Sequence, residues 1–328
     1  MPDLPVAAEI ASVLRGAKRI AIASHVRPDG DAVGSLLGLA LSLRALGKEV
    51  VALLEDGVPE NLAFLPGTDT VLRPTMSELA VDVAVALDTA THERVGDRCK
   101  ALLDTAPLLV NIDHHPTNPA YGTLNLIDSD APATGQIVYD LLTAHGLPVD
   151  DAVRQNLFVA ISTDTGSFQF SSTNARTHRI AAEMIEAGLD TARLARLTYQ
   201  SCPLRRLELL RAMLNEMSFR AQGRIVSWQL TQQRMDEVGM QPGDTEGLID
   251  TLRQIDSVVG CVIFEDVAGG KVRVSARSKD SRLDVSALCG RFGGGGHRMA
   301  AGARMSGPIE VAAEKFLQVL EDEVGRIG

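Results

Sequence analysis

The chain has 328 residues, of which 45% are hydrophobic and 4% aromatic, and its formal net charge is −10. The length favours two domains, and the hydrophobic fraction is typical of a globular protein rather than a disordered one. The negative charge disfavours tight binding of long nucleic acid. There is no run of about 18 apolar residues and no basic start of a secretion signal, so we expect a cytoplasmic protein without a membrane partner.

The charge is unevenly distributed along the chain. Residues 271–304 contain eight Lys and Arg but only two Asp, so the remainder is more acidic than the total suggests. One basic segment on an acidic body suggests a small anionic substrate that is held locally. The four cysteines lie far apart without a C-x-x-C pair, which argues against a thiolate zinc site or a disulfide framework.

Expected strands and helices alternate in the first half of the chain. Apolar periodicity and the breaks at Gly and Pro predict helices at 9–18, 32–46, 133–145 and 151–162. Short apolar runs predict strands at 19–24, 50–54, 83–87, 108–112 and 124–127. This alternation indicates an α/β domain with a doubly wound parallel sheet.

The pattern changes after residue 190. Leu and Met recur at helical spacing over 191–217, interrupted at Pro203, and the following segment mixes strand-like runs with helices at about 244–255 and 308–324. We therefore expect a first domain at 1–190, a helical linker at 191–220 and a smaller α+β domain at 221–328.

Acidic and imidazole side chains follow the expected strands and helices of the first domain. The residues are His25, Asp29, Asp31, Asp88, Asp113, His114, His115 and Asp164. Ligands of open α/β sheets bind where the carboxyl ends of the strands meet, so we expect these side chains to converge. Carboxylate oxygens mixed with imidazole suit manganese, and magnesium less well. Two divalent cations at such a site serve phosphoryl displacement.

Single members of this set have simpler interpretations. Asp31 could be the N-cap of the helix at 32–46. Asp88 could be a solvated strand end, and Asp164 could belong to the turn before Gly166. Their joint occurrence at element ends favours the metal site.

The basic segment holds a second group of candidate residues. The glycine run 293–296 before His297 can turn backbone N–H groups toward an anion, although such a run alone is more often a flexible turn. Arg277, with Arg273 and Arg298, strengthens the phosphate-binding interpretation because guanidinium groups bind phosphate in a fork. The low aromatic content argues against an extended base-stacking track.

Together these motifs resemble the DHH phosphoesterase superfamily. Its four motifs match His25/Asp29/Asp31, Asp88, Asp113-His114-His115 and Asp164, and the segment with Arg277 and the glycine run is similar to the DHHA1 domain. In length, and without extra domains, the chain looks most like the NrnA-like branch of nanoRNases and pAp phosphatases. The resemblance covers nearly the whole chain.

The resemblance implies a role for each matching residue. One metal ion would be held by His25, Asp29 and Asp88, and the other by Asp31, Asp88, His114 and Asp164. His115 and Asp88 would be catalytic, with His115 acting on the departing oxygen, and Asp113 would orient a ligand histidine. The substrate would be bound by Arg277, Gly294, Gly295, Gly296 and His297. Two manganese ions, or magnesium or cobalt, and a homodimer are also implied.

The implied activity is hydrolysis of short oligoribonucleotides to mononucleotides and of 3′-phosphoadenosine 5′-phosphate (pAp) to AMP. A phosphodiesterase for cyclic or linear dinucleotides uses the same fold and metals, so this alternative stays open. A nucleotide-sensing module without turnover is disfavoured because no ligand residue is missing. The glycine loop argues against a family II pyrophosphatase, and the length and acidity argue against a RecJ-type exonuclease.

Overall fold

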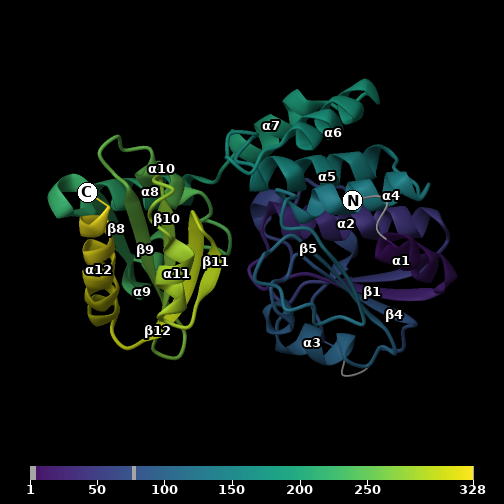
Figure 1. Cartoon of the computed structure of the whole chain (residues 1–328), viewed down its shortest axis with the longest axis horizontal. Coiled ribbons are helices and arrows are strands. Elements are labelled where there is room, and N and C mark those ends of the chain that lie inside the picture. The colour runs from purple at the N-terminus through teal and green to yellow at the C-terminus, as the bar shows by residue number, and fades with distance from the viewer. Residues whose placement is uncertain (1–4, 76–78, 328) are drawn as a thin grey trace. The chain divides into compact units, whose positions relative to one another are not determined.

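The computed structural model describes residues 5–75 and 79–327. The chain divides into two compact units, Met1–Ser201 and Cys202–Gly328 (Figure 1). Within the described ranges, no helix combines the length and the apolar character needed to cross a membrane.

The first unit is built on a six-stranded sheet. In spatial order the strands are β3 (Val71–Leu72), β2 (Glu49–Leu53), β1 (Arg19–Ala23), β4 (Val83–Leu87), β5 (Leu109–Asp113) and β6 (Leu124–Ile127). Every neighbouring pair is parallel. The strand order runs outward in both directions from the β1–β4 pair, which confirms the predicted doubly wound sheet.

Helices cover both faces of this sheet (Figure 1). One face packs against α1 (Pro5–Gly16), α2 (Gly30–Ala45), α4 (Thr134–Ala144) and α5 (Asp151–Asp164), and the other against α3 (Asp97–Leu103). The helices α6 (Ala175–Glu186) and α7 (Thr191–Tyr199) pack on α5. Short 3-10 helices lie at Glu60–Leu62, Thr68–Thr70 and His92–Val95.

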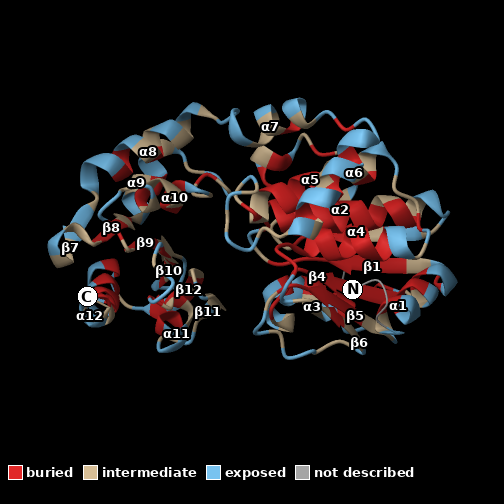
Figure 2. Ribbon diagram, turned by 45° about the horizontal axis from the view of Figure 1, so that its top comes forward, coloured by how far each residue is buried: buried red, intermediate tan, exposed pale blue. Residues whose placement is uncertain are grey.

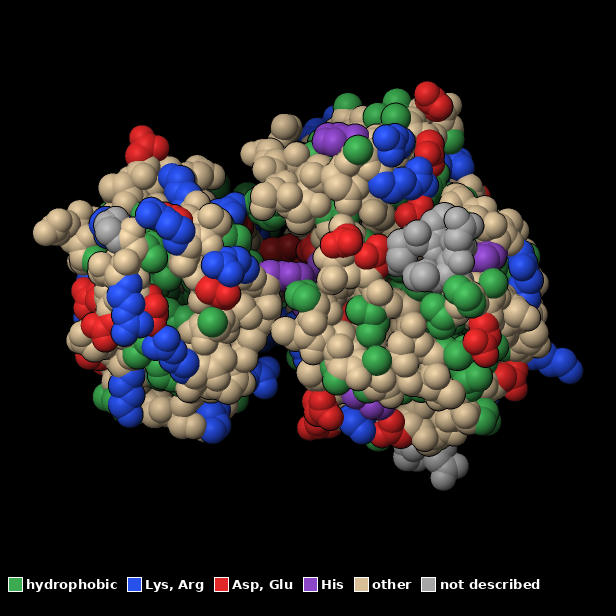
Figure 3. Space-filling model, viewed as in Figure 1, with side chains coloured by type: hydrophobic (Ala, Val, Ile, Leu, Met, Phe, Trp, Pro, Cys, Tyr) green, Lys and Arg blue, Asp and Glu red, His purple; other side chains and the backbone are tan. Residues whose placement is uncertain are grey.

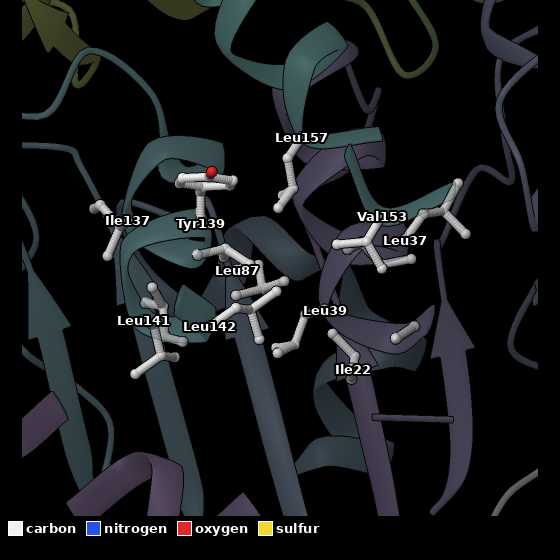
Figure 4. Packing of buried hydrophobic residues seen from close by; sticks show 14 of the residues in the cluster. Ile22, Leu37, Leu39, Leu87, Ile137, Tyr139, Leu141, Leu142, Val153 and Leu157 are labelled. Carbon is white, nitrogen blue, oxygen red and sulfur yellow. The ribbon is translucent and has the colours of Figure 1, made fainter. Parts of the chain in front are cut away.

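Helix α2 lies at the centre of the first unit and is buried along almost its whole length (Figure 2). Its glycines let α5 approach closely, because a Cβ at Gly34 would lie 2.4 Å from Asn156 O and one at Gly38 would lie 2.5 Å from Leu157 Cδ2. Figure 4 shows Leu157 of α5 in the same apolar cluster as Leu37 and Leu39 of α2. This close packing fixes the start of α2 beside the end of α5.

The second unit contains another six-stranded sheet. In spatial order its strands are β11 (Gly295–His297), β12 (Ala300–Ser306), β10 (Lys271–Ser278), β9 (Gly260–Val267), β8 (Ile225–Leu230) and β7 (Ser218–Arg220). All neighbours are antiparallel except the parallel pair of β8 and β9. The mixed sheet and its helices confirm the predicted smaller α+β fold.

Each face of the second sheet has its own core (Figure 2). One core contains α11 (Val285–Gly290) and α12 (Ile309–Arg326), and the other contains α8 (Leu204–Glu216), α9 (Gln232–Val238) and α10 (Leu248–Arg253). A short 3-10 helix lies at Ala221–Gly223. The expected linker at 191–220 contains the helices α7 and α8 and the strand β7. The division between the two units falls between α7 and α8.

Candidate metal centre

The structure brings the expected ligands of the first unit to one edge of the parallel sheet. His25 follows β1, Asp88 follows β4 and His114 follows β5, so these three come from neighbouring strands. Asp29 and Asp31 lie at the start of α2, and Asp164 is the last residue of α5. Close packing of α2 against α5 therefore places the helix-borne carboxylates beside the strand-borne residues.

Two groups of nitrogen and oxygen atoms form at this edge. In the first, His25 Nε2 lies 3.6 Å from Asp29 Oδ1 and 3.4 Å from Asp88 Oδ2. In the second, His114 Nε2 lies 3.3 Å from Asp164 Oδ2 and 3.4 Å from Asp88 Oδ1. Asp31 belongs to the second group. The potential ligand atoms lie within 4.8 Å of one another in each of two sets of three residues, His25/Asp29/Asp88 and Asp31/His114/Asp164.

Asp88 connects the two groups. Its Oδ2 faces His25, its Oδ1 faces His114, and its side chain is almost completely buried. It is also one of the few non-glycine residues with a positive φ, at 55°, and such backbone strain persists only where the surrounding fold enforces it. Its carboxylate is therefore held in a fixed position between the two groups.

The residue that caps the N-terminus of α2 differs from the one suggested by the sequence. The N-cap is Asp29, whose Oδ1 accepts hydrogen bonds from the backbone N–H groups of Asp31 and Ala32 at 3.1 and 3.0 Å. Asp31 lies in the first turn and is fully buried. The simpler interpretation of Asp31 as the cap is therefore wrong.

The carboxylate of Asp31 instead meets the start of α4. Its Oδ2 accepts a hydrogen bond from the N–H of Thr134 at 2.6 Å, and its Oδ1 accepts one from Gly135 N–H at 2.8 Å. The N-terminus of a helix stabilises an anion through these N–H groups and the helix dipole. The Thr134 hydroxyl donates to Asp88 Oδ1 at 3.1 Å. Sequence reasoning missed Thr134, although its position at the start of a predicted helix is a usable signal.

The electrostatics of the buried cluster fit cations. Burial would lower the pKa of His25, but Asp29 and Asp88 outweigh it and raise the pKa to about 10. Burial raises the pKa of Asp164 to about 8, and burial with the charges of Asp88 and Asp164 raises the pKa of Asp31 well above its usual value. Buried carboxylates so close together need positive charge, either as bound protons or as metal ions. The oxygen and imidazole donors fit divalent cations.

Asp113 and His115 form a hydrogen-bonded pair beside the two groups. His115 Nδ1 lies 2.8 Å from Asp113 Oδ1, and the Asp113 side chain is fully buried. Asn118, which sequence reasoning also missed, donates from Nδ2 to Asp113 Oδ2 at 2.6 Å and to Asn111 Oδ1 at 2.8 Å. The carboxylate is thus held between an amide and an imidazole, which fixes the orientation of the His115 ring.

The expected substrate-binding residues lie in the second unit, on the strands at one side of its sheet. In the pairing register, His297 of β11 lies opposite Ala300 of β12, which lies opposite Arg277 of β10, so His297 and Arg277 share one face. Two members of the glycine run pack tightly, since a Cβ would lie 2.1 Å from Gly302 O at Gly294 and 2.7 Å from Ala300 O at Gly296. Arg298 instead donates from Nε to Ser281 O at 2.7 Å. Figure 3 shows several Lys and Arg side chains on the visible face of this unit.

Two known families match this chain, one in each unit. The model of the DHH family, N-terminal domain, matches residues 19–161, and that of the DHHA1 domain matches residues 228–326. The bifunctional oligoribonuclease and PAP phosphatase NrnA of Thermus thermophilus is 33% identical over 97% of this chain and 94% of its own length. The protein of the same name from Bacillus subtilis is 29% identical over 90% of this chain and 92% of its own length.

A solved structure supports the same relationship. The chain matches an exopolyphosphatase-related protein from Bacteroides fragilis with a TM-score of 0.86 and 25% sequence identity, covering 97% of this chain and 96% of that one. Both units are therefore found together in a protein of similar length. From its two domain matches and its relatives, this chain is an enzyme of the DHH/DHHA1 phosphoesterase superfamily and belongs to the NrnA-like branch.

Proposed function

We propose that the chain is a divalent-metal-dependent phosphoesterase that hydrolyses short oligoribonucleotides to mononucleotides and pAp to AMP. The relatives from Thermus thermophilus and Bacillus subtilis carry these two activities in their names and align over most of the chain. The observation that carries the proposal is the position of Asp88, whose two carboxylate oxygens each face a different histidine.

The proposed ligands follow the two groups of side chains. His25, Asp29 and Asp88 would hold one cation, and Asp31, Asp88, His114 and Asp164 would hold the other. Manganese is the proposed ion because manganese sites combine carboxylate and imidazole donors. Magnesium and cobalt are the alternatives. Bound there, two divalent cations would stabilise the charge on the attacking and leaving oxygens.

The chain's own residues suit the proton transfer that completes hydrolysis. Asp113 Oδ1 accepts a hydrogen bond from His115 Nδ1, so the second nitrogen, Nε2, is the one that can exchange a proton with the substrate. Because Asn118 holds the other oxygen of Asp113, the ring is fixed before the substrate binds. His115 would then donate a proton to the departing oxygen.

The remaining parts of the proposal concern the second unit and the assembly. Residues 221–328 would bind the substrate through Arg277, Gly294, Gly295, Gly296 and His297, with 191–220 as the linker to a catalytic domain at 1–190. A small anionic substrate suits the single basic segment of an acidic chain. A homodimer and a cytoplasmic location are expectations from the resemblance and the composition.

The test is release of mononucleotide from a 5′-phosphorylated RNA dinucleotide in manganese buffer. Parallel reactions contain pAp, a cyclic dinucleotide or pyrophosphate, and each is repeated with Asp88→Ala. We expect turnover of the RNA dinucleotide and pAp, and loss of both in the variant. Turnover of the cyclic dinucleotide alone would replace the substrate assignment, and binding without any turnover would favour a sensing module.

A further inference from the structure

A group of buried polar side chains lies behind the pair formed by Asp113 and His115. Asn111 precedes Asp113 by two residues in β5, so both side chains point to one face of the sheet. Val110 and Ile112 point to the other face, into the core with α2. Asn111 is fully buried. A buried amide is unfavourable unless it is hydrogen-bonded, so both of its polar atoms require partners.

The amide of Asn111 bonds at both ends. Its Oδ1 accepts a hydrogen bond from Asn118 Nδ2 at 2.8 Å. Its Nδ2 donates to the hydroxyl of Tyr121 at 3.1 Å and, at the longer distance of 3.4 Å, to Ala86 O. Asn118 Nδ2 also donates to Asp113 Oδ2 at 2.6 Å. The two amides therefore connect the hydroxyl of Tyr121 to the carboxylate of Asp113.

Tyr121 is held on two sides. Its ring stacks on that of His92, with centroids 4.9 Å apart and planes inclined by 11°. Its hydroxyl is hydrogen-bonded to Thr89 Oγ1, and Thr89 is fully buried directly after Asp88. Asn118 Nδ2 lies 3.1 Å from the backbone oxygen of the same threonine. The network therefore also contacts the residue next to Asp88.

The hydroxyl of Tyr121 determines which way the amide of Asn111 faces. An amide presents an acceptor at one end and a donor at the other. The hydroxyl can give its own hydrogen to Thr89 and accepts one from Asn111 Nδ2, so Oδ1 faces Asn118. Without the hydroxyl, the reversed amide becomes accessible and brings two NH2 groups together. Asn118 would then have to turn, and its hydrogen bond to Asp113 would be lost.

We propose that Tyr121 is a positioning residue of the hydrolytic reaction. Its hydroxyl orients the amide of Asn111, which in turn orients that of Asn118. The Asn118 amide then keeps the Asp113 carboxylate in place against His115. This inference rests on the proposed function, in which His115 donates a proton to the departing oxygen. Tyr121 belongs to neither group of proposed metal ligands, so its hydroxyl can be removed without removing a ligand.

The test compares Tyr121→Phe with Tyr139→Phe. The first variant keeps the ring that stacks on His92 and removes only the hydroxyl. The second removes a hydroxyl of α4 that bonds to Glu183 at 3.1 Å, which is the same chemical change outside the network. We expect Tyr121→Phe to lower kcat for pAp about tenfold with unchanged KM, a part of the roughly 100-fold or more that a positioned proton donor supplies. Tyr139→Phe should keep the original kcat.

A double-variant cycle shows whether Tyr121 acts through His115. In His115→Gln the proton donor is absent, so adding Tyr121→Phe should lower kcat no further. A hydroxyl that only stabilises the fold would lower kcat by the same factor in both backgrounds. That outcome, or an unchanged kcat in Tyr121→Phe alone, would overturn the positioning role.

The ring of His115 can also be observed without turnover. Nuclear magnetic resonance of protein with isotope-labelled histidine, in magnesium buffer, reports whether Nδ1 carries the proton that Asp113 accepts, and His115→Gln identifies the signal. We expect a protonated Nδ1 in the original protein and in Tyr139→Phe, and a shift toward the unprotonated value in Tyr121→Phe. Identical His115 signals in all three proteins would contradict the inference. If the spectral change occurs but the original protein cleaves neither RNA nor pAp, only the proposed function fails.

Discussion

The candidate metal centre of the first unit and the sheet face that carries Arg277 and His297 in the second unit present charge in opposite ways. At the centre, Asp31 and Asp88 are buried, and α4 donates hydrogen bonds to both of them. On the sheet face, Arg277 is partly exposed. A metal cation requires several donor atoms at fixed positions. The phosphates of a flexible oligonucleotide require only nearby positive side chains. We therefore expect substitutions to abolish function at the centre and only to weaken it on the face.

The sharpest test of this contrast is Asp88→Asn. The amide keeps the size of the side chain but removes the charge shared by the two groups, so we expect activity to fall about 1,000-fold or more. Manganese should raise the melting temperature of the original protein, because a ligand that binds the folded state stabilises it. The variant should lose most of that rise.

The matched control for Asp88→Asn is Asp97→Asn, which alters an exposed carboxylate of α3. It should keep both the activity and the effect of manganese on melting. If Asp88→Asn keeps its full manganese response, the assignment of Asp88 as the shared ligand is wrong.

A smaller effect is expected at Thr134, which touches the centre without being a proposed ligand. Thr134→Val keeps the shape of the side chain and the backbone N–H to Asp31 but removes the hydroxyl that donates to Asp88. Loss of a group that orients a metal ligand typically lowers metal affinity or activity about 10- to 100-fold. A manganese titration followed by electron paramagnetic resonance should show this loss.

Thr134→Ser tests whether the hydroxyl is responsible. Serine retains the donor, so we expect it to restore manganese affinity close to that of the original protein. If the valine and serine variants bind manganese equally, the hydrogen bond to Asp88 does not position the ligand.

The backbone N–H of Thr134 also marks the limit of what the sequence predicts. The strands β1, β4 and β5 and the proposed ligands after them follow from local apolar runs and strand ends. The bond from Thr134 to Asp31 spans 103 residues and depends on how α4 docks against α2, which no local pattern specifies. The sequence pattern also suggested Asp31 as the cap of α2, whereas the structure has Asp29 in that position.

The short edge strands escaped prediction for a related reason. β3, β7 and β11 have only two or three residues each, and their existence depends on pairing with a longer neighbour. The glycine run indicated a loop, yet Gly295–His297 forms β11, and its pairing with β12 places His297 on the same face as Arg277. The residue types of the candidate site were predictable, but their register was not.

The smallest effect is expected on the sheet face, where the paired variants Arg277→Gln and Arg298→Gln give the finest test. Arg277 shares its face with His297, whereas Arg298 donates to Ser281 O and lies 3.4 Å from Asp284. Removing one charged hydrogen-bonding group from a bound phosphate should raise KM for pAp about tenfold in Arg277→Gln, with manganese affinity unchanged. Exposed ion pairs contribute little, so Arg298→Gln should leave KM near its original value. Equal KM values in the two variants, or a lower manganese affinity in Arg277→Gln, would contradict the assignment of Arg277 as a substrate-binding residue.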